Sequence, residues 1–312
     1  RGCTALTEIN FNEGLSKIGS WAFGNTKLVK VEFPDTLKSI GIYSFYNITT
    51  LEQVDFAKIE KIDGNAFANC TALCSTVTNN VLEIPETVTT VGANAFQNCT
   101  SIKRLYWYAV KLTSGGAGNM ENPAFKGCTG LTGSITIPKT LTSTNSWIFE
   151  DCTNLDTVVF EEGMTKIPDN MLCGATDVKN VIIPSTVTSI GFCAFYNCTG
   201  LTVVIIPSSV TAIEASSFSK CDSITDVYFT GTEEQWNQIE ISDNNESLTT
   251  AIIHYDYKDD SREHVLSEWA IEKSSTCTTA GAKVRRCVIC NRVIETEAIS
   301  PLGHSFSNWV VI

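Results

Sequence analysis

One phrase recurs along most of this chain: an aromatic residue, a cysteine, a leucine, a short β-branched segment and a proline. The clearest copy runs over residues 183–201, and the next begins at Ile206-Pro207. A unit of this size cannot bury its own apolar face, so neighbouring copies must stack and share one core. The sequence therefore predicts a solenoid, and this constrains the fold more than any other feature.

An anchor residue marks each copy, and successive anchors are 22 to 29 residues apart. After the anchor, each copy has the form Leu-x-x-Val-x-Ile-Pro, whose β-branched residues favour a strand and whose proline ends it. We expect a short helix or turn ending near each anchor, then one strand, and a parallel sheet made by stacking the strands. The anchors are Phe23, Phe45, Phe67, Phe96, Phe125, Phe149, Leu172, Phe195 and Phe218.

Seven of the 13 cysteines occupy one position of the repeat. A residue that recurs once per coil forms a ladder along the solenoid axis, and a free cysteine is a small side chain that buries well. Stacked coils hold parallel side chains too far apart for good disulfide geometry, so we expect packed thiols. Disulfides between adjacent coils are the alternative. The ladder positions are Cys3, Cys70, Cys99, Cys128, Cys152, Cys198 and Cys221.

The repeat pattern I-P-x-x-V-x-x-I-x-x-x-A-F-x-x-C-x-x-L resembles the BspA-type leucine-rich repeat of bacterial surface proteins, over residues 1–229. The copies at Phe23, Phe45 and Leu172 depart from it, since they have no cysteine at the ladder position. The resemblance implies a right-handed leucine-rich-repeat solenoid of α/β repeats, with short parallel strands in a curved sheet. It also implies a secreted, surface-exposed adhesion or recognition protein and not an enzyme.

The chain is expected to change character twice after the repeats. Residues 230–257 should cap the solenoid: Thr232 and Gln235 fit a capping box before a short helix with Trp236, and one more strand should lie within residues 248–255. Residues 258–303 then form a small Cys/His module. A second, incomplete module is expected to begin at residue 304 and to occupy 304–312.

The small module is too short to bury much core, so it needs a metal or a disulfide. Cys277, Cys287 and Cys290, with His304 or His264, could bind a structural zinc ion as Cys₃His. A disulfide from Cys277 to Cys287 or Cys290 and a reduced site without metal remain alternatives.

Outward-facing positions of the strands are the candidate binding surface. The residue before the last apolar residue of each strand, and the residue two positions earlier, should face away from the core. Toward the C-terminal copies these positions become apolar, and contiguous exposed apolar side chains often mark interaction surfaces. Trp107 should point inward, leaving its two neighbours outward. The candidate binding residues are Tyr106, Tyr108, Val159, Ile182, Val203, Ile205 and Tyr228.

Charge argues against several classes of partner. The net charge is −12, and residues 258–312 hold seven Lys/Arg and seven Asp/Glu, so the whole excess lies in residues 1–257. Such a protein is a poor match for nucleic acid or an anionic membrane. No apolar run approaches the ~20 residues of a membrane-spanning helix. Because residue 1 falls in mid-repeat, we expect a natural N-terminus further upstream, so the lack of a signal peptide carries little weight.

The sequence shows no recognisable set of catalytic residues. All three histidines lie beyond residue 250, so the repeats contain no histidine that could act as a general base. We therefore expect an extracellular or cell-surface scaffold that binds a protein of a host or neighbouring cell through the sheet face. A structural stalk that presents another domain and a carbohydrate-binding surface, which would rely on Tyr106 and Tyr108, are the alternatives.

Overall fold

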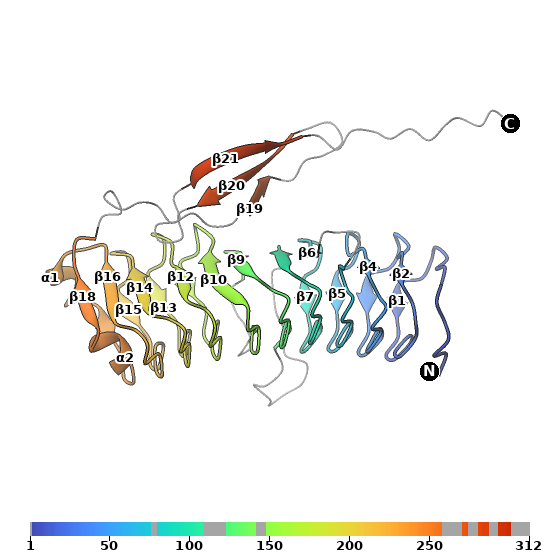
Figure 1. Cartoon of the computed structure of the whole chain (residues 1–312), viewed down its shortest axis with the longest axis horizontal. Helices are drawn as coiled ribbons and strands as arrows, with labels where there is room; N and C mark the ends of the chain where they lie inside the picture. The colour runs from blue at the N-terminus through green and yellow to red at the C-terminus, as the bar shows by residue number, and fades with distance from the viewer. Residues whose placement is uncertain are drawn as a thin grey trace. The chain divides into compact units, whose positions relative to one another are not determined.

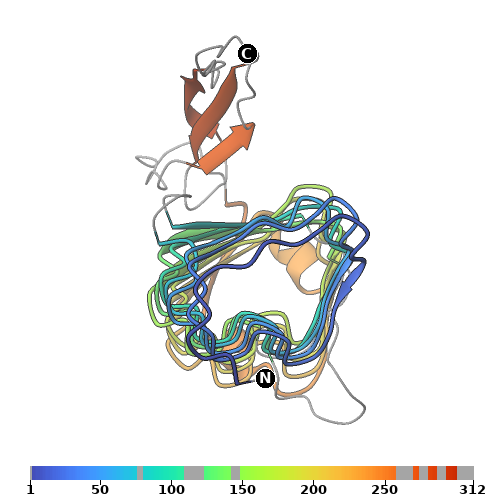
Figure 2. The same ribbon diagram turned by 90° about the vertical axis from the view of Figure 1, so that its right-hand side faces the viewer.

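A computed structural model describes residues 2–75, 80–108, 123–141, 148–257, 270–273, 280–286 and 293–300. The chain separates into two compact units, Arg1–Lys258 and Asp259–Ile312. The first, here the solenoid unit, is a parallel β-solenoid of about nine turns. Its coils form a nearly straight row in Figure 1 and superimpose when viewed along the axis in Figure 2. Stacking of the repeats, as predicted, is confirmed.

The predicted strand of each repeat is present and pairs in parallel with the strand of the adjacent coil. The residues of each strand that face inward are buried, as Val227 and Phe229 are in the strand Asp226–Phe229. We call this set the long strands, although β2 and β4 have two residues each, and it forms the sheets β2-β4, β6-β8, β12-β10-β9 and β14-β16-β18. Their bounds are β2 Lys30–Val31, β4 Gln53–Val54, β6 Val81–Ile84, β8 Arg104–Trp107, β9 Gly133–Ile137, β10 Leu155–Phe160, β12 Asn180–Ile182, β14 Val203–Ile206, β16 Asp226–Phe229 and β18 Ile252–His254.

A second set of strands, which the sequence analysis did not anticipate, follows the proline turn. Each has two residues, the second being a buried Ile or Val in all but the last strand. They form the parallel sheets β1-β3-β5-β7 and β11-β13-β15-β17. Their bounds are β1 Lys17–Ile18, β3 Ser39–Ile40, β5 Lys61–Ile62, β7 Thr90–Val91, β11 Lys166–Ile167, β13 Ser189–Ile190, β15 Ala212–Ile213 and β17 Glu240–Ile241.

The third side of each coil carries the anchor and is built from turns. A helix at this position was one of the two expectations, and the α part of the expected α/β repeat is wrong throughout the described coils, where helices occur only in the cap. The physical reason is that residues two before and two after the anchor adopt positive φ, as at Asn65 (56°) and Asn69 (62°) around Phe67. A left-handed residue ends a right-handed helical turn, and Asn tolerates this conformation better than most residues.

These left-handed residues turn the anchor segment into a hydrogen-bonded ladder between coils. Asn65, Phe67 and Asn69 donate their N–H groups to carbonyls of the next coil, at 2.8, 2.8 and 2.7 Å. Equivalent bonds join Trp21, Phe23 and Asn25 to the coil after theirs. In both cases the N–H groups point toward the C-terminal end of the stack. The backbone N–H groups on this side of the coil are therefore hydrogen-bonded to neighbouring coils and not within a helix.

The left-handed conformation gives a direct prediction at Asn170, whose φ is 57°. Replacement Asn170→Ala should lower the free energy of unfolding by about 1 kcal/mol, because a Cβ without a local polar group is disfavoured there. Replacement Asn170→Gly should change it by less than about half of that, since glycine adopts positive φ freely. Urea unfolding of both variants checks the prediction, which would be wrong if Ala were tolerated as well as Gly.

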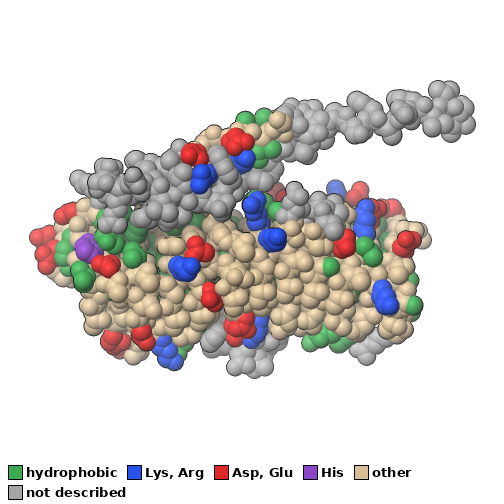
Figure 3. All heavy atoms as spheres, viewed as in Figure 1, with side chains coloured by type: hydrophobic (Ala, Val, Ile, Leu, Met, Phe, Trp, Pro, Cys, Tyr) green, Lys and Arg blue, Asp and Glu red, His purple; other side chains and the backbone are tan. Residues whose placement is uncertain are grey.

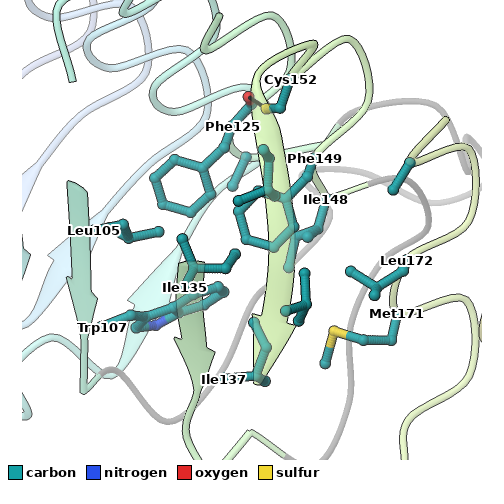
Figure 4. Close-up of a cluster of buried hydrophobic side chains, with 14 of the residues drawn as sticks. Leu105, Trp107, Phe125, Ile135, Ile137, Ile148, Phe149, Cys152, Met171 and Leu172 are labelled. Carbon is teal, nitrogen blue, oxygen red and sulfur yellow. Dashed lines mark hydrogen bonds between the residues drawn. The ribbon is translucent and has the colours of Figure 1, made fainter. Parts of the chain in front are cut away.

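Anchor rings stack along the axis in the core. Phe45 and Phe67 have ring centroids 5.2 Å apart and parallel planes, and Phe67 and Phe96 follow at 5.6 Å. The strand residues pack beneath them, among them Leu105, Trp107 and Ile135 around Phe125 in Figure 4. Trp107 is 3% exposed, which confirms its predicted inward orientation. The apolar core is thus continuous from coil to coil.

The cysteine ladder lies beside the anchor rings, with thiols packed as predicted. The Sγ of Cys70 lies 3.1 Å from the anchor carbonyl of Phe45 in the preceding coil, and Cys128 Sγ lies 3.1 Å from that of Phe96. The same bond recurs at Cys99, Cys152, Cys198 and Cys221. All ten described cysteines are free thiols. Cys3 is exposed, so its predicted inward placement is wrong; its segment lies at the N-terminal end of the row of coils.

The cap contains α1 (Glu233–Trp236) and α2 (Glu246–Thr249). The predicted capping box is confirmed: Gln235 N–H donates to Thr232 Oγ1 at 3.3 Å, and Thr232 N–H donates to Gln235 Oε1 at 2.9 Å. The expected strand over 248–255 is shorter, because Leu248 lies in α2 and buries its side chain in the core. Strand β18 supplies the remainder.

The second unit, where described, is a small antiparallel sheet of order β19-β20-β21. Its strands are β19 Ala270–Lys273, β20 Gly281–Arg286 and β21 Val293–Ile299. Two cross-strand ion pairs join its last two strands, Lys283 to Glu297 at 3.0 Å and Arg285 to Glu295 at 3.3 Å. Exposed pairs of this kind contribute little, typically below about 1 kcal/mol each.

Candidate functional site

The outward side of the long strands, here called the long-strand face, holds the candidate binding residues. Parallel register aligns Val159 of β10 with Ile182 of β12, and Ile205 of β14 with Tyr228 of β16. Val159, Ile205 and Tyr228 are half-buried, as expected for side chains on an open sheet. Figure 3 shows hydrophobic side chains gathered on this side of the solenoid unit toward its C-terminal coils.

Ile182 departs from the prediction of an exposed apolar patch. Its side chain is only 6% exposed, so it belongs to the buried residues. The register places Val159 directly beside Ile182 on β10, and β12 also contacts β14 of the following coil. The apolar surface therefore has less accessible area at its centre than the sequence indicated.

Tyr106 and Tyr108 lie apart from the C-terminal residues, because the three strands β9, β10 and β12 come between them and β14. Tyr106 on β8 pairs in register with Glu83 on β6, and Tyr108 is 46% exposed. Partial burial, and then the nearby charges of Glu83 and Tyr106, raise the pKa of the Tyr108 hydroxyl. Both tyrosines point outward as predicted, but they form a separate cluster.

The C-terminal end of the face carries a polar and aromatic group that the sequence analysis missed. We define the C-terminal patch as Val203, Ile205, Asp226, Tyr228, Ile252 and His254. Two parallel registers bring these residues into adjacent columns across β14, β16 and β18. Ile252 is 63% exposed, the most exposed of the large hydrophobic side chains in the described residues.

His254 organises the patch. Its Nε2 lies 2.8 Å from Oδ1 of Asp226, and its ring stacks on Tyr228 with centroids 4.5 Å apart and planes 12° apart. The hydrogen bond from His254, then that from Thr225, lowers the pKa of the Asp226 carboxyl. The signal that could have found the group is the equal spacing of Asp226/Tyr228 and Ile252/His254 within two consecutive strands.

The buried thiols do not offer a reactive site. Desolvation by the surrounding core raises the pKa of Cys70 and of Cys128 to about 12, and raises that of Cys99 and Cys152 well above the usual range. A protonated thiol is a poor nucleophile and a poor metal ligand. The ladder therefore fills the core and bonds to carbonyls.

Metal binding was expected at Cys277, Cys287, Cys290 and His304 or His264, all of which lie outside the described residues. Within the part of the chain that the structure describes, there is no group of three or more His, Cys, Asp or Glu side chains that could hold a metal ion. The same residues include no helix long and apolar enough to cross a membrane.

Comparison with known proteins decides the family. A sequence model described as "BspA type Leucine rich repeat region" matches in six copies over residues 1–103, 74–174 and 107–225. The chain belongs to this family. BspA-type scaffolds are typically non-catalytic, and the family is commonly related to the cell surface and to adhesion. No curated protein sequence matches the chain.

Solved structures support the fold of this BspA-type protein. It is similar to a leucine-rich repeat protein from Bacteroides ovatus, with 19% identity, a TM-score of 0.54, and coverage of 81% of this chain and 73% of that one. It is also similar to a leucine-rich repeat protein from Eubacterium ventriosum, with 19% identity, a TM-score of 0.50, and coverage of 84% of this chain and 68% of that one. For a leucine-rich cell-surface protein from Faecalibacterium prausnitzii, the identity is 21%, the TM-score is 0.29, and the match covers 76% of this chain and 89% of that one. The first two establish the leucine-rich repeat fold.

Proposed function

We propose that this BspA-type chain is an extracellular recognition scaffold that binds a protein of a host or neighbouring cell through the long-strand face. The observation that carries the proposal is the C-terminal patch, where Ile252, which is 63% exposed, and the half-buried Val203 lie on either side of Asp226. Exposed apolar side chains grouped on one face and rimmed by polar residues are typical of interaction surfaces. A structural stalk would not require such a patch.

The acidic charge of the solenoid unit agrees with a protein partner. Since the full excess of −12 lies in residues 1–257, complementary partners carry basic surfaces, and long-range attraction would accelerate encounter. Association should therefore slow as salt concentration rises. The outward-facing aromatic pair Tyr106 and Tyr108, of which Tyr108 is 46% exposed, is the feature that favours a glycan ligand instead.

The test is a pair of matched double variants of the full chain. Val203→Glu with Ile252→Glu introduces charge into the patch, and Ile42→Glu with Phe192→Glu introduces the same charges at exposed apolar residues outside it; Ile42 and Phe192 are both 46% exposed. Circular dichroism first confirms folding of each. Binding to a panel of purified matrix proteins and glycans is then measured by surface plasmon resonance.

We expect the patch variant to lose at least about tenfold in affinity for a protein on the panel, equal to about 1.4 kcal/mol, while the control variant binds like wild type. Equal binding by wild type and patch variant would contradict the proposal. Binding only to glycans, lost on changing Tyr106 and Tyr108, would instead support the carbohydrate-binding alternative, and no binding by any form would favour the stalk.

A further inference from the structure

We propose that the C-terminal patch binds an arginine side chain of the partner protein, with Asp226 as its carboxylate ligand and the Tyr228–His254 ring pair as its stacking surface. This inference rests on the proposed function and names the chemistry that the long-strand face recognises. It is carried by three features of the patch: an anionic oxygen pair, a stacked aromatic pair and the exposed apolar side chain of Ile252.

Asp226 has the character of a ligand for a cation. Its Oδ1 lies 2.8 Å from His254 Nε2 and its Oδ2 accepts from Thr225 Oγ1 at 2.8 Å, so two neighbours fix the carboxylate plane. These bonds lower the pKa of Asp226, which therefore stays ionised at neutral pH. Its side chain is 29% exposed, so solvent and a ligand can reach it.

The charge of Asp226 is not balanced by a permanent cation among the described residues. Its ionic partner there is His254, which carries charge only when protonated. The lysines of the solenoid unit that form ion pairs face other carboxylates, as Lys166 faces Asp169 and Glu214. An additional cation at Asp226 would offset one negative charge of the solenoid unit, whose residues 1–257 carry a net charge of −12.

The aromatic side of the patch suits a planar cation. Tyr228 stacks on His254 at 4.5 Å, and Tyr257 meets Tyr228 at 4.9 Å with planes 56° apart. A guanidinium group can form two parallel hydrogen bonds to a carboxylate while its plane lies against aromatic rings, which an ammonium group cannot do. The attraction of a cation to an aromatic ring adds to the pairing. Arginine is therefore preferred to lysine.

Apolar neighbours complete the match. Register places Val203 and Ile252 on either side of Asp226 in the same column. Arginine carries a three-methylene stem that packs on apolar surface while its head group remains polar. The 63% exposure of Ile252 provides that surface next to the carboxylate.

The experiment uses a blocked Gly-Arg-Gly peptide, and the same peptide with citrulline, which is uncharged but nearly isosteric with arginine. Each is titrated into the full chain at low salt, and the methyl resonances of Ile252 and Ile253 are followed by NMR. The variants are Asp226→Asn, Tyr228→Leu and the control Glu240→Gln, which removes one exposed charge from β17 at the same end of the stack. Folding of each variant is checked by urea unfolding.

We expect saturable shifts with the arginine peptide, at least tenfold weaker binding of the citrulline peptide, and a comparable loss in Asp226→Asn. Tyr228→Leu should weaken binding severalfold while Glu240→Gln leaves it unchanged. Equal binding of both peptides, or of wild type and Asp226→Asn, would overturn the inference.

The outcome is separable from that of the proposed function. If the patch variant Val203→Glu with Ile252→Glu loses a protein partner but the arginine peptide never binds, only the arginine inference fails. If the peptide binds through Asp226 while no protein depends on the patch, the arginine site stands and the proposed function fails.

Discussion

The solenoid unit should lose several kcal/mol of stability between pH 8 and pH 10 through its buried thiols. The folded state raises the pKa of Cys70 and Cys128 to about 12, whereas a thiol in the unfolded chain titrates near 8.5. The native state thus keeps protons that the unfolded state releases. The stabilising contribution is complete below about pH 8.5 and is lost as pH rises toward 12, at roughly 1.4 kcal/mol per pH unit for each thiol.

Matched variants isolate this effect from the titration of Lys and Tyr side chains. In Cys70→Ser with Cys128→Ser, a hydroxyl can still donate to the carbonyls of Phe45 and Phe96 but does not titrate in this range. Above about pH 9, the stability of the double variant should fall less steeply with pH than that of wild type, by roughly 2.8 kcal/mol per pH unit from the two thiols. Urea unfolding under reducing conditions from pH 7 to 10 measures it, and parallel curves for the two proteins would refute the prediction.

Removal of the Asn245 side chain should lower the free energy of unfolding by roughly 3 kcal/mol, since it leaves several buried groups unpaired. Asn245 is 3% exposed and its amide closes the open end of the anchor ladder. Its Oδ1 accepts the N–H of Phe218 at 2.9 Å, where a further coil would have supplied a carbonyl. Its Nδ2 donates to the carbonyls of Glu214 at 3.0 Å and Ser242 at 2.9 Å.

The variant Asn245→Ala tests this prediction against Asn237→Ala, which changes an exposed asparagine of the same cap. In chemical unfolding, the free energy of unfolding of Asn245→Ala should be lower than that of Asn237→Ala by most of the predicted loss of roughly 3 kcal/mol. Native-state hydrogen exchange should also show faster exchange of the Phe218 amide in Asn245→Ala, because that N–H loses its acceptor. Equal stability of the two variants, with an unchanged Phe218 amide, would show that the cap does not depend on this side chain.

Features that recur once per coil were predictable because the same type of residue occupies the same position in many copies of the repeat. The inward direction of Trp107, the ladder of thiols and the long strands all followed from residue type at a fixed position. The capping box at Thr232 was predictable for another reason, since its two hydrogen bonds span only three residues. For the capping box, the sequence pattern and the interaction lie in the same short segment.

Other features depend on contacts that no local pattern encodes. The two-residue strands, such as Ser189–Ile190, are too short to display an alternating pattern. Of the two expectations for the anchor segment, helix or turn, the turn is present because of left-handed residues such as Asn65 and Asn69, whose spacing around the anchor was the available signal. Burial of Ile182 and the cap function of Asn245 each arise from distant segments, as does the pairing of His254 with Asp226.

The one-way direction of the anchor ladder has an electrical consequence. Its peptide N–H groups point along the axis toward the C-terminal end, so their dipoles add, with the positive end at the cap and the negative end at the first coil. Acceptors are therefore required at one end and donors at the other. The cap provides acceptors, the Asp243 carbonyl for the Ser216 N–H and the Asn245 amide oxygen for that of Phe218. The polarity of the stack makes its two ends chemically unlike, and a cap that closes one cannot close the other.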